Sequence, residues 1–162
     1  MNVSAQEFKE SGFCDDILEI IRESDVPADR VAIELTESEN DSDFLVAQEK
    51  ISELKERGIC FYLDDFGTGY SSMERIMQLP FDIIKFDRSL VIASATDPKA
   101  AAMVRSMAQL FRDLDYSVLY EGIETTTDEE RCSGMSASYL QGYKYSRPVP
   151  LEEMGQFFSR EN

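Results

Sequence analysis

The sequence predicts an α/β fold, an incomplete (β/α)8 TIM-like barrel of mostly parallel strands in which the first strands are missing. Short apolar segments alternate with segments of helical periodicity, as is typical of parallel strands covered by helices. Polar residues recur where the apolar segments end, and the carboxyl ends of barrel strands share one face. We expect five whole strands and the end of a sixth in the 162 residues, whereas a complete barrel has eight strands in about 250 residues.

Apolar spacing and stop signals place the elements of the first half of the chain. Apolar residues recur every three or four positions in the helical segments, and Pro27 and Gly58 end two of them. The expected elements are the end of a strand at 1–4, a short helix at 4–9, a helix at 13–23, a strand at 31–37, a helix at 43–57 and a strand at 59–63.

The second half of the chain repeats this alternation. Pro80 ends a short helix, and Gly134 weakens a later one. The expected elements are a short helix at 73–78, a strand at 81–87, a helix at 98–114, a strand at 116–121, a helix at 127–135, a strand at 138–142 and a closing helix at 151–159.

Composition excludes several classes of function. The formal net charge of −16, from 32 acidic and 16 basic residues, makes DNA and RNA poor partners. The absence of histidine excludes the Ser-His-Asp and Cys-His mechanisms. Three widely spaced cysteines without a C-x-x-C pair favour a reducing cytosol over disulfides or a zinc site. No apolar run approaches the roughly 18 residues that a membrane span needs, so we expect a cytoplasmic domain without membrane contact, although a parent protein could be membrane-tethered.

An acidic turn follows the apolar segment at residues 59–63. Asp64 and Asp65 are adjacent carboxylates that repel one another, and Gly67 lets the backbone turn sharply after them. A metal or phosphate site explains such a pair, while the plainer interpretation is a polar turn with a helix N-cap. The other expected strands also end in polar side chains, which are Asn2, Glu34, Lys85, Glu121 and Gln141. We therefore expect one polar site at the carboxyl ends of the strands.

Six segments of the chain carry the motifs of a known family. Residues 64–72 read D-D-F-G-T-G-Y-S-S, and the others are N-V-S at 2–4, E-x-T-E at 34–37, L-P-x-D-x-x-K-x-D at 79–87, E-G-x-E-T at 121–125 and Q-G-Y at 141–143, followed by S-R-P at 146–148. With these motifs the chain resembles the EAL domain, a bacterial phosphodiesterase that hydrolyses cyclic di-GMP. The Glu-Ala-Leu segment that names the family does not precede N-V-S, and that portion would hold one metal-ligand glutamate and an arginine-bearing strand. We therefore expect residues 1–162 to be a single partial EAL domain, truncated at its N-terminus.

The resemblance implies a site with two Mg²⁺ or Mn²⁺ ions. Asn2, Glu34 and Asp64 would hold one ion together with the absent glutamate. Asp64 would bridge to the second ion, which Asp65 and Glu121 complete, and Glu121 would also serve in catalysis. Hard divalent ions prefer carboxylate and amide oxygens, and two of them together can activate a water and hold a phosphodiester.

The remaining polar residues each have two interpretations. Lys85 would be a catalytic residue that orients the attacking water, or only a counter-ion for the acids. Gln141 would donate a hydrogen bond to water or phosphate, or be a satisfied amide at a strand end. Glu37 and Glu124 would support the acidic turn, or lie near helix N-termini. Asp87 would contact the ligand or cap the helix that follows it.

The function expected from the resemblance is metal-dependent hydrolysis of cyclic di-GMP to linear pGpG by the parent EAL domain, in bacterial second-messenger signalling. The isolated 162-residue chain is expected to be weak or inactive, and its open sheet edges favour a homodimer or other self-association. The alternative is a non-catalytic cyclic di-GMP-binding or dimerising regulatory module. A Schiff-base enzyme that uses Lys85 is disfavoured, because the surrounding acids oppose the neutral amine.

Overall fold

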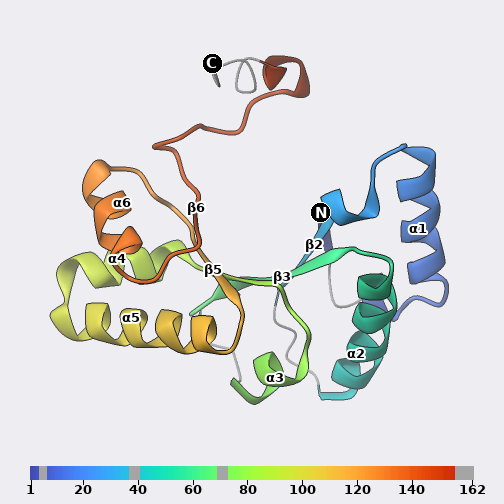
Figure 1. The fold of residues 1–162 in the computed structure, drawn as a ribbon, viewed down its shortest axis with the longest axis horizontal. Helices are drawn as coiled ribbons and strands as arrows, with labels where there is room; N and C mark the ends of the chain where they lie inside the picture. The colour runs from blue at the N-terminus through green and yellow to red at the C-terminus, as the bar shows by residue number, and fades with distance from the viewer. Residues whose placement is uncertain (4–6, 37–40, 69–72, 156–162) are drawn as a thin grey trace.

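The computed structural model describes residues 1–3, 7–36, 41–68 and 73–155 of the chain, and its strands form one six-stranded sheet (Figure 1). The strands are β1 (Asn2–Val3), β2 (Ala32–Thr36), β3 (Cys60–Phe66), β4 (Ile83–Phe86), β5 (Ser117–Tyr120) and β6 (Tyr139–Leu140). Neighbours in the chain are neighbours in the sheet, and their pairings are parallel. This order confirms the predicted fold, in which consecutive β-α units build part of a TIM-like barrel.

Helical segments connect the successive strands, and the last helical segment follows β6. They are η1 (Glu7–Lys9), α1 (Phe13–Glu23), η2 (Ala28–Arg30), α2 (Asp41–Glu56), α3 (Met73–Gln78), α4 (Arg88–Thr96), α5 (Pro98–Asp113), α6 (Thr126–Ser133) and η3 (Leu151–Glu153). In Figure 1, α1 and α2 lie beside one end of the sheet, and α4, α5 and α6 lie beside the other. Among the described residues, none of the helices has the length and apolar character that crossing a membrane requires.

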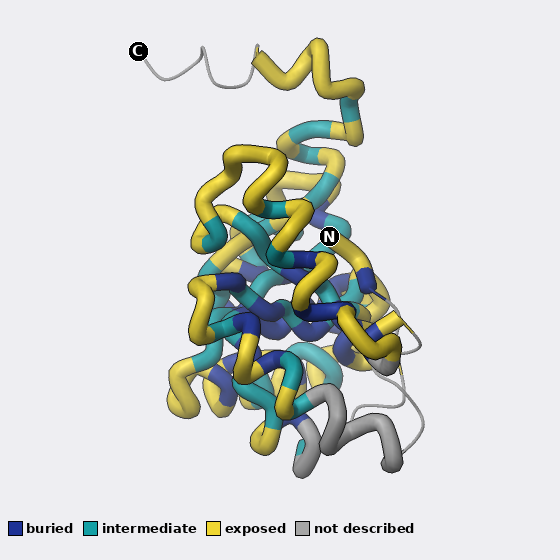
Figure 2. The backbone as a smooth tube through the Cα atoms, turned by 90° about the vertical axis from the view of Figure 1, so that its right-hand side faces the viewer, coloured by how far each residue is buried: buried dark blue, intermediate teal, exposed yellow. Residues whose placement is uncertain are grey.

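Alternation along the strands separates the core from the opposite face of the sheet. Ile33 and Leu35 of β2 are buried, and so are Phe61 and Leu63 of β3. Successive side chains of a strand point to opposite faces, so Glu34 lies on the face away from this core. Figure 2 shows that the buried parts of the chain gather in the middle of the molecule, with exposed segments around them.

Helix α5 shows how the sequence builds the outer layer. Asp97 caps the helix by accepting a hydrogen bond from Lys99 N at 2.9 Å, and Pro98 begins it, where the missing N–H costs nothing. Val104 and Phe111 lie on one buried face at helical spacing. The Phe111 ring packs edge-on against Phe66 of β3, with ring centroids 5.1 Å apart. This contact fixes the helix against the strand that carries the acidic pair.

Several elements differ from those expected, and one of them is the 3-10 turn η2, for which no element was expected. Strand β3 continues through Phe66 instead of ending before the acids, because its pairing with β4 resumes at Phe66. The helix α4, which Asp87 caps, has no bounds among the expected elements, since it buries only Val91 and Ser94 and so has a weak apolar stripe. The closing helix is described only as the 3-10 turn η3, and residues 156–162 lie outside the described residues.

Candidate functional site

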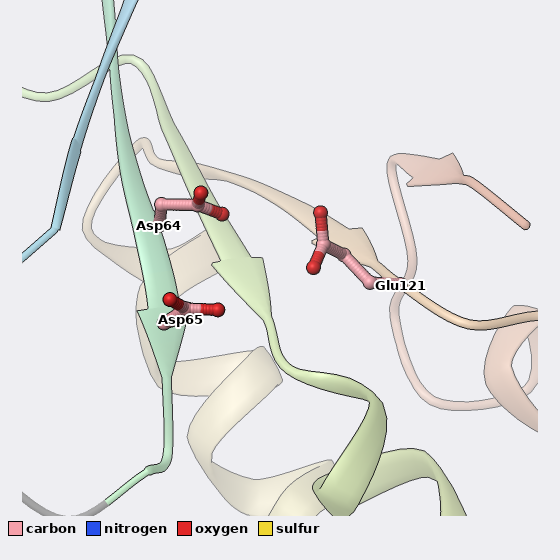
Figure 3. A group of neighbouring side chains, drawn as sticks. All are labelled: Asp64, Asp65 and Glu121. Carbon is pink, nitrogen blue, oxygen red and sulfur yellow. The ribbon is translucent and has the colours of Figure 1, made fainter. Parts of the chain in front are cut away.

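A β-bulge turns the two adjacent aspartates to the same side. Leu63 pairs with Ile84 and Phe66 pairs with Phe86, so β3 advances three residues where β4 advances two. The extra residue is taken up at Asp65, whose φ of 56° lies in the left-handed region. In a regular strand the side chains of neighbours would point to opposite faces. Figure 3 instead shows the carboxylates of Asp64 and Asp65 both pointing toward Glu121, which follows β5.

Lys85 of β4 lies at the centre of the site. The residue is buried, and its Nζ lies 2.9 Å from Glu34 Oε2, 2.8 Å from Asp64 Oδ1 and 2.8 Å from Glu121 Oε1. The three acids come from β2, from β3 and from the end of β5. The parallel registers explain why residues so distant in sequence meet here.

Negative charge exceeds positive charge at this site. One carboxylate oxygen from each of Asp64, Asp65 and Glu121 lies within 4.8 Å of the other two. With Glu34, four carboxylates therefore gather at this site, and Lys85 is the cation that the described residues place in contact with three of them. Asp64 Oδ1 is buried and has no hydrogen-bond partner among the described residues, since its 2.8 Å approach to the lysine lacks hydrogen-bond geometry. A hard divalent cation fits such a set of oxygen donors.

The electrostatics explain which groups are charged. Burial lowers the pKa of Lys85, but its contacts with Asp64, Glu121 and Glu34 outweigh burial and raise the pKa above its usual range. The lysine is therefore an ammonium at neutral pH, which opposes the Schiff-base alternative. Burial raises the pKa of Glu121, which the Lys85 contact only partly offsets. Burial and then Asp64 likewise raise the pKa of Asp65.

The other expected residues lie around this centre or outside the described residues. Asp87 caps α4, because its Oδ1 accepts a hydrogen bond from Ser89 N at 2.9 Å. Asn2 pairs in register with Glu34, which places it at the same end of the sheet. Gln141 directly follows β6, where its backbone N donates to Tyr120 O at 2.9 Å. The predicted support by Glu37 falls outside the described residues.

Glu124 contacts a residue that sequence reasoning missed. Its Oε1 lies 2.7 Å from Nη2 of Arg88, the first residue of α4. Arg88 follows Asp87 directly, so the readable signal was a basic residue next to a polar strand end. The helix that begins there was expected only as something that Asp87 would cap, without bounds, and Arg88 therefore had no assigned place.

Comparison with known proteins agrees with the fold and the motifs. The sequence model of the EAL domain matches residues 1–148. The cyclic di-GMP phosphodiesterase RocR of Pseudomonas aeruginosa is 32% identical over 158 residues, which are 98% of this chain and 40% of RocR. A solved structure of the PaMucR phosphodiesterase of the same species, in complex with c-di-GMP, matches with a TM-score of 0.85 and 31% identity over 94% of this chain and 62% of that chain.

A third relative was solved with a metal. The calcium and c-di-GMP complex of BlrP1 from Klebsiella pneumoniae matches with a TM-score of 0.83 and 26% identity, over 91% of this chain and 38% of that chain. Matches to curated relatives extend over only part of their length, from 20% of the oxygen sensor DosP of Escherichia coli to 40% of RocR. The family match and the fold confirm the resemblance read from the motifs, and the chain belongs to the EAL domain family.

Proposed function

We propose that this chain carries the active site of a metal-dependent phosphodiesterase that opens cyclic di-GMP to linear pGpG. The observation that carries the proposal is the convergence of Glu34, Asp64 and Glu121 on Lys85, with Asp65 beside them. Phosphodiester hydrolysis needs an activated water and neutralised phosphoryl oxygens, and carboxylates with divalent ions meet both needs. RocR and PaMucR, both similar to this chain, are named as phosphodiesterases.

The ligand sets are those that the family resemblance implies, and the positions of the carboxylates support them. Asn2, Glu34 and Asp64 would hold one Mg²⁺ or Mn²⁺ ion, and Asp64, Asp65 and Glu121 would hold the second. The buried oxygen of Asp64 without a hydrogen-bond partner supports this assignment. When bound, two such ions supply a water of lowered pKa and positive charge at the phosphate oxygens.

Lys85 provides fixed positive charge in this reaction. As an ammonium it cannot accept the proton of the attacking water, but it can donate hydrogen bonds to that water or to a phosphoryl oxygen. Its three carboxylate contacts hold the side chain in one place, so little reorganisation is needed when negative charge develops. We assign it the role of orienting the water and stabilising the developing charge.

A hydrolysis assay tests the proposal. A protein that carries residues 1–162 within a complete EAL domain is incubated with cyclic di-GMP in Mg²⁺, in Mn²⁺ and in EDTA, and the products are separated by chromatography. We expect pGpG only with a divalent ion, and a loss of about 100-fold or more in Asp65→Asn. Glu19→Gln, an exposed change on α1, serves as the matched control with wild-type activity. Product formation that is insensitive to EDTA would contradict the metal-dependent mechanism.

A second candidate applies to the 162-residue chain assayed alone. Among the described strands, β1 and β6 each have a neighbour on one side only. We infer that the isolated chain hydrolyses cyclic di-GMP weakly or not at all, and that it binds the dinucleotide or self-associates. Calorimetric titration with cyclic di-GMP, together with light scattering, separates these outcomes. Rapid turnover by the isolated monomer would overturn this inference.

We place the reaction in the cytoplasm, in keeping with the three free cysteines.

A further inference from the structure

Arg88, the first residue of α4, reaches across to the loop that follows β5. Its Nη2 lies 2.7 Å from Glu124 Oε1, and the two side chains are 54% and 43% exposed. An ion pair this exposed contributes little to stability. Because this ion pair lies at the rim of the acidic site, we looked to the geometry of the site and not to stability for its role.

The aliphatic stem of Arg88 lies on the residue after Glu121. Gly122 has a φ of 72°, and a Cβ built on it would lie 2.4 Å from Arg88 Cγ and 2.8 Å from Arg88 Cδ. No side chain fits between Gly122 and the Arg88 stem, so the stem packs directly on the glycine. The guanidinium group of Arg88 therefore contacts Glu124 while its aliphatic stem packs on Gly122, so one side chain contacts two residues of the loop.

The opposite side of this loop is held by the segment after β6. Ile123 N donates a hydrogen bond to Gln141 O at 3.0 Å, and Lys144 N donates to Ile123 O at 3.0 Å. A Cβ built on Gly142 would lie 2.1 Å from Ile123 O, which shows how closely the two segments approach. The loop is therefore held between the Arg88 side chain and this backbone.

Glu121 begins the loop and depends on how it is held. Its backbone N donates to Phe86 O at 3.0 Å, which fixes the strand side of the residue. On the other side follows Gly122, whose backbone has wide conformational freedom unless neighbours restrict it. Building on the proposed function, we propose that Arg88 is a positioning residue, which clamps Gly122 and Glu124 so that the Glu121 carboxylate stays with Asp64 and Asp65.

Substitutions separate the stem of the arginine from its charge. Arg88→Ala removes both, Arg88→Met keeps the stem over Gly122, and Arg88→Lys keeps the stem and the charge. Glu124→Gln weakens the same contact from the other partner. Arg22→Ala is the matched control, because it breaks an exposed arginine–glutamate pair with Glu19 on α1, remote from the site.

The first measurement is amide hydrogen exchange in EDTA, which requires neither metal nor activity. We expect the amides of Glu121 and Ile123 to exchange about two- to fivefold faster in Arg88→Ala, the factor that loss of an exposed ion pair allows. Arg88→Lys should restore much of the protection, and Arg22→Ala should leave it unchanged. Equal exchange in Arg88→Ala and wild type would overturn the clamp.

The second measurement is a Mn²⁺ titration followed by thermal unfolding. Loss of support for a metal ligand raises the midpoint of such a titration about tenfold, and we expect this in Arg88→Ala with partial rescue in Arg88→Lys. Faster exchange with an unchanged Mn²⁺ midpoint would overturn the link to Glu121. A wild-type protein that binds no Mn²⁺ would overturn the proposed two-metal site, while the exchange data would still decide whether Arg88 holds the loop. If Arg88→Ala does not fold, Arg88→Met and Glu124→Gln provide the same comparison.

Discussion

Two lysines contact carboxylates at opposite ends of the same sheet. At the amino ends of the strands, Lys55 Nζ lies 2.7 Å from Asp82 Oδ1 and donates to Pro80 O at 2.7 Å. The other oxygen of Asp82 accepts the backbone N–H of Phe61 at 2.8 Å. At the carboxyl ends, Lys85 faces three carboxylates, and one oxygen of this cluster has no hydrogen-bond partner among the described residues.

The ratio of charges distinguishes the two ends. The Lys55 pair is one cation with one anion, and each oxygen of Asp82 has a partner, as expected of a group that only joins α2 to the sheet. The Lys85 cluster has more acids than one ammonium can neutralise, which a fold does not need for stability. Excess negative charge around a buried lysine therefore points to a cation supplied from outside.

The largest expected effect comes from removing the central ammonium. In EDTA, Lys85→Met leaves Glu34, Asp64 and Glu121 close together without a cation, which should cost about 3–5 kcal/mol in the free energy of unfolding. Hydrolysis should fall by about 100-fold or more. Urea unfolding with EDTA or Mn²⁺ and initial rates measure both effects, and Mn²⁺ should recover part of the stability. An unchanged unfolding midpoint in EDTA would show that the lysine is not the counter-ion of the cluster.

A smaller effect is expected at the amino ends of the strands. Asp82→Ala removes the acceptor of the buried Phe61 N–H, which should cost about 1–3 kcal/mol. Asp82→Asn, which keeps an acceptor there, should cost less. Activity per folded molecule should stay at the wild-type level in both variants, as measured by active-site-normalised rates. If either Asp82 variant lost activity without losing stability, the amino ends of the strands would take part in function, and the two ends of the sheet would not differ as argued.

Removing the charge of Lys55 should have a smaller effect on the free energy of unfolding than either change described above. Lys55 and Asp82 have side chains that are 28% and 37% exposed, and Lys55→Met leaves the hydrogen bond from Phe61 N in place. We expect a cost of about 1 kcal/mol or less by urea unfolding, with no change in rate. A cost equal to that of Lys85→Met would mean that burial and charge excess do not set the difference.

The fold could be predicted because its signals are local. Alternating apolar segments indicated each strand, and the bounds shifted by only a few residues. The bounds of α4 were missed because the helix buries little, although the cap at Asp87 was one of the two interpretations of that residue. The bulge at Asp65 could not be predicted, since it depends on the pairing of Phe66 with Phe86, twenty residues further along the chain.

The site could be predicted in outline but not in geometry. The rule that parallel strands end at one face brought Glu34 and Lys85 together across 51 residues. The direction of the Asp65 side chain depends on a left-handed backbone conformation that no local pattern required. The contact of Arg88 with Glu124 joins the start of α4 to the loop after β5, and these approach one another because β4 and β5 lie side by side. The metal and catalytic roles of the site residues stay predictions until the assays above are done.

The smallest expected effect is the pH dependence of the free energy of unfolding. It tests whether the pKa of a carboxyl in the acidic site is shifted in the opposite direction from that of an ordinary paired carboxyl. Burial raises the pKa of Glu121 despite Lys85, whereas at Asp128 burial is outweighed by hydrogen bonds with Thr125 and Arg131, which lower the pKa. Stability from a raised carboxyl pKa is present below the unfolded-state value and is lost as pH rises through the folded one. Stability from a lowered carboxyl pKa is present above the unfolded-state value and is lost as pH falls through the folded one.

In EDTA, the stability of wild type relative to Glu121→Gln should therefore fall as pH rises from about 4 to 7. Its stability relative to Asp128→Asn should instead rise as pH rises through the acidic range up to about 4, near the pKa of an unfolded aspartate, and stay level from there to about 7. The rise occurs because that carboxylate is better stabilised when folded than unfolded. Urea unfolding at several pH values measures both differences. Saturating Mn²⁺ should reverse the sign for Glu121 alone, because a bound cation favours its charged form. If Mn²⁺ moved both differences equally, or neither, the acid excess around Lys85 would not be what draws a cation to the site.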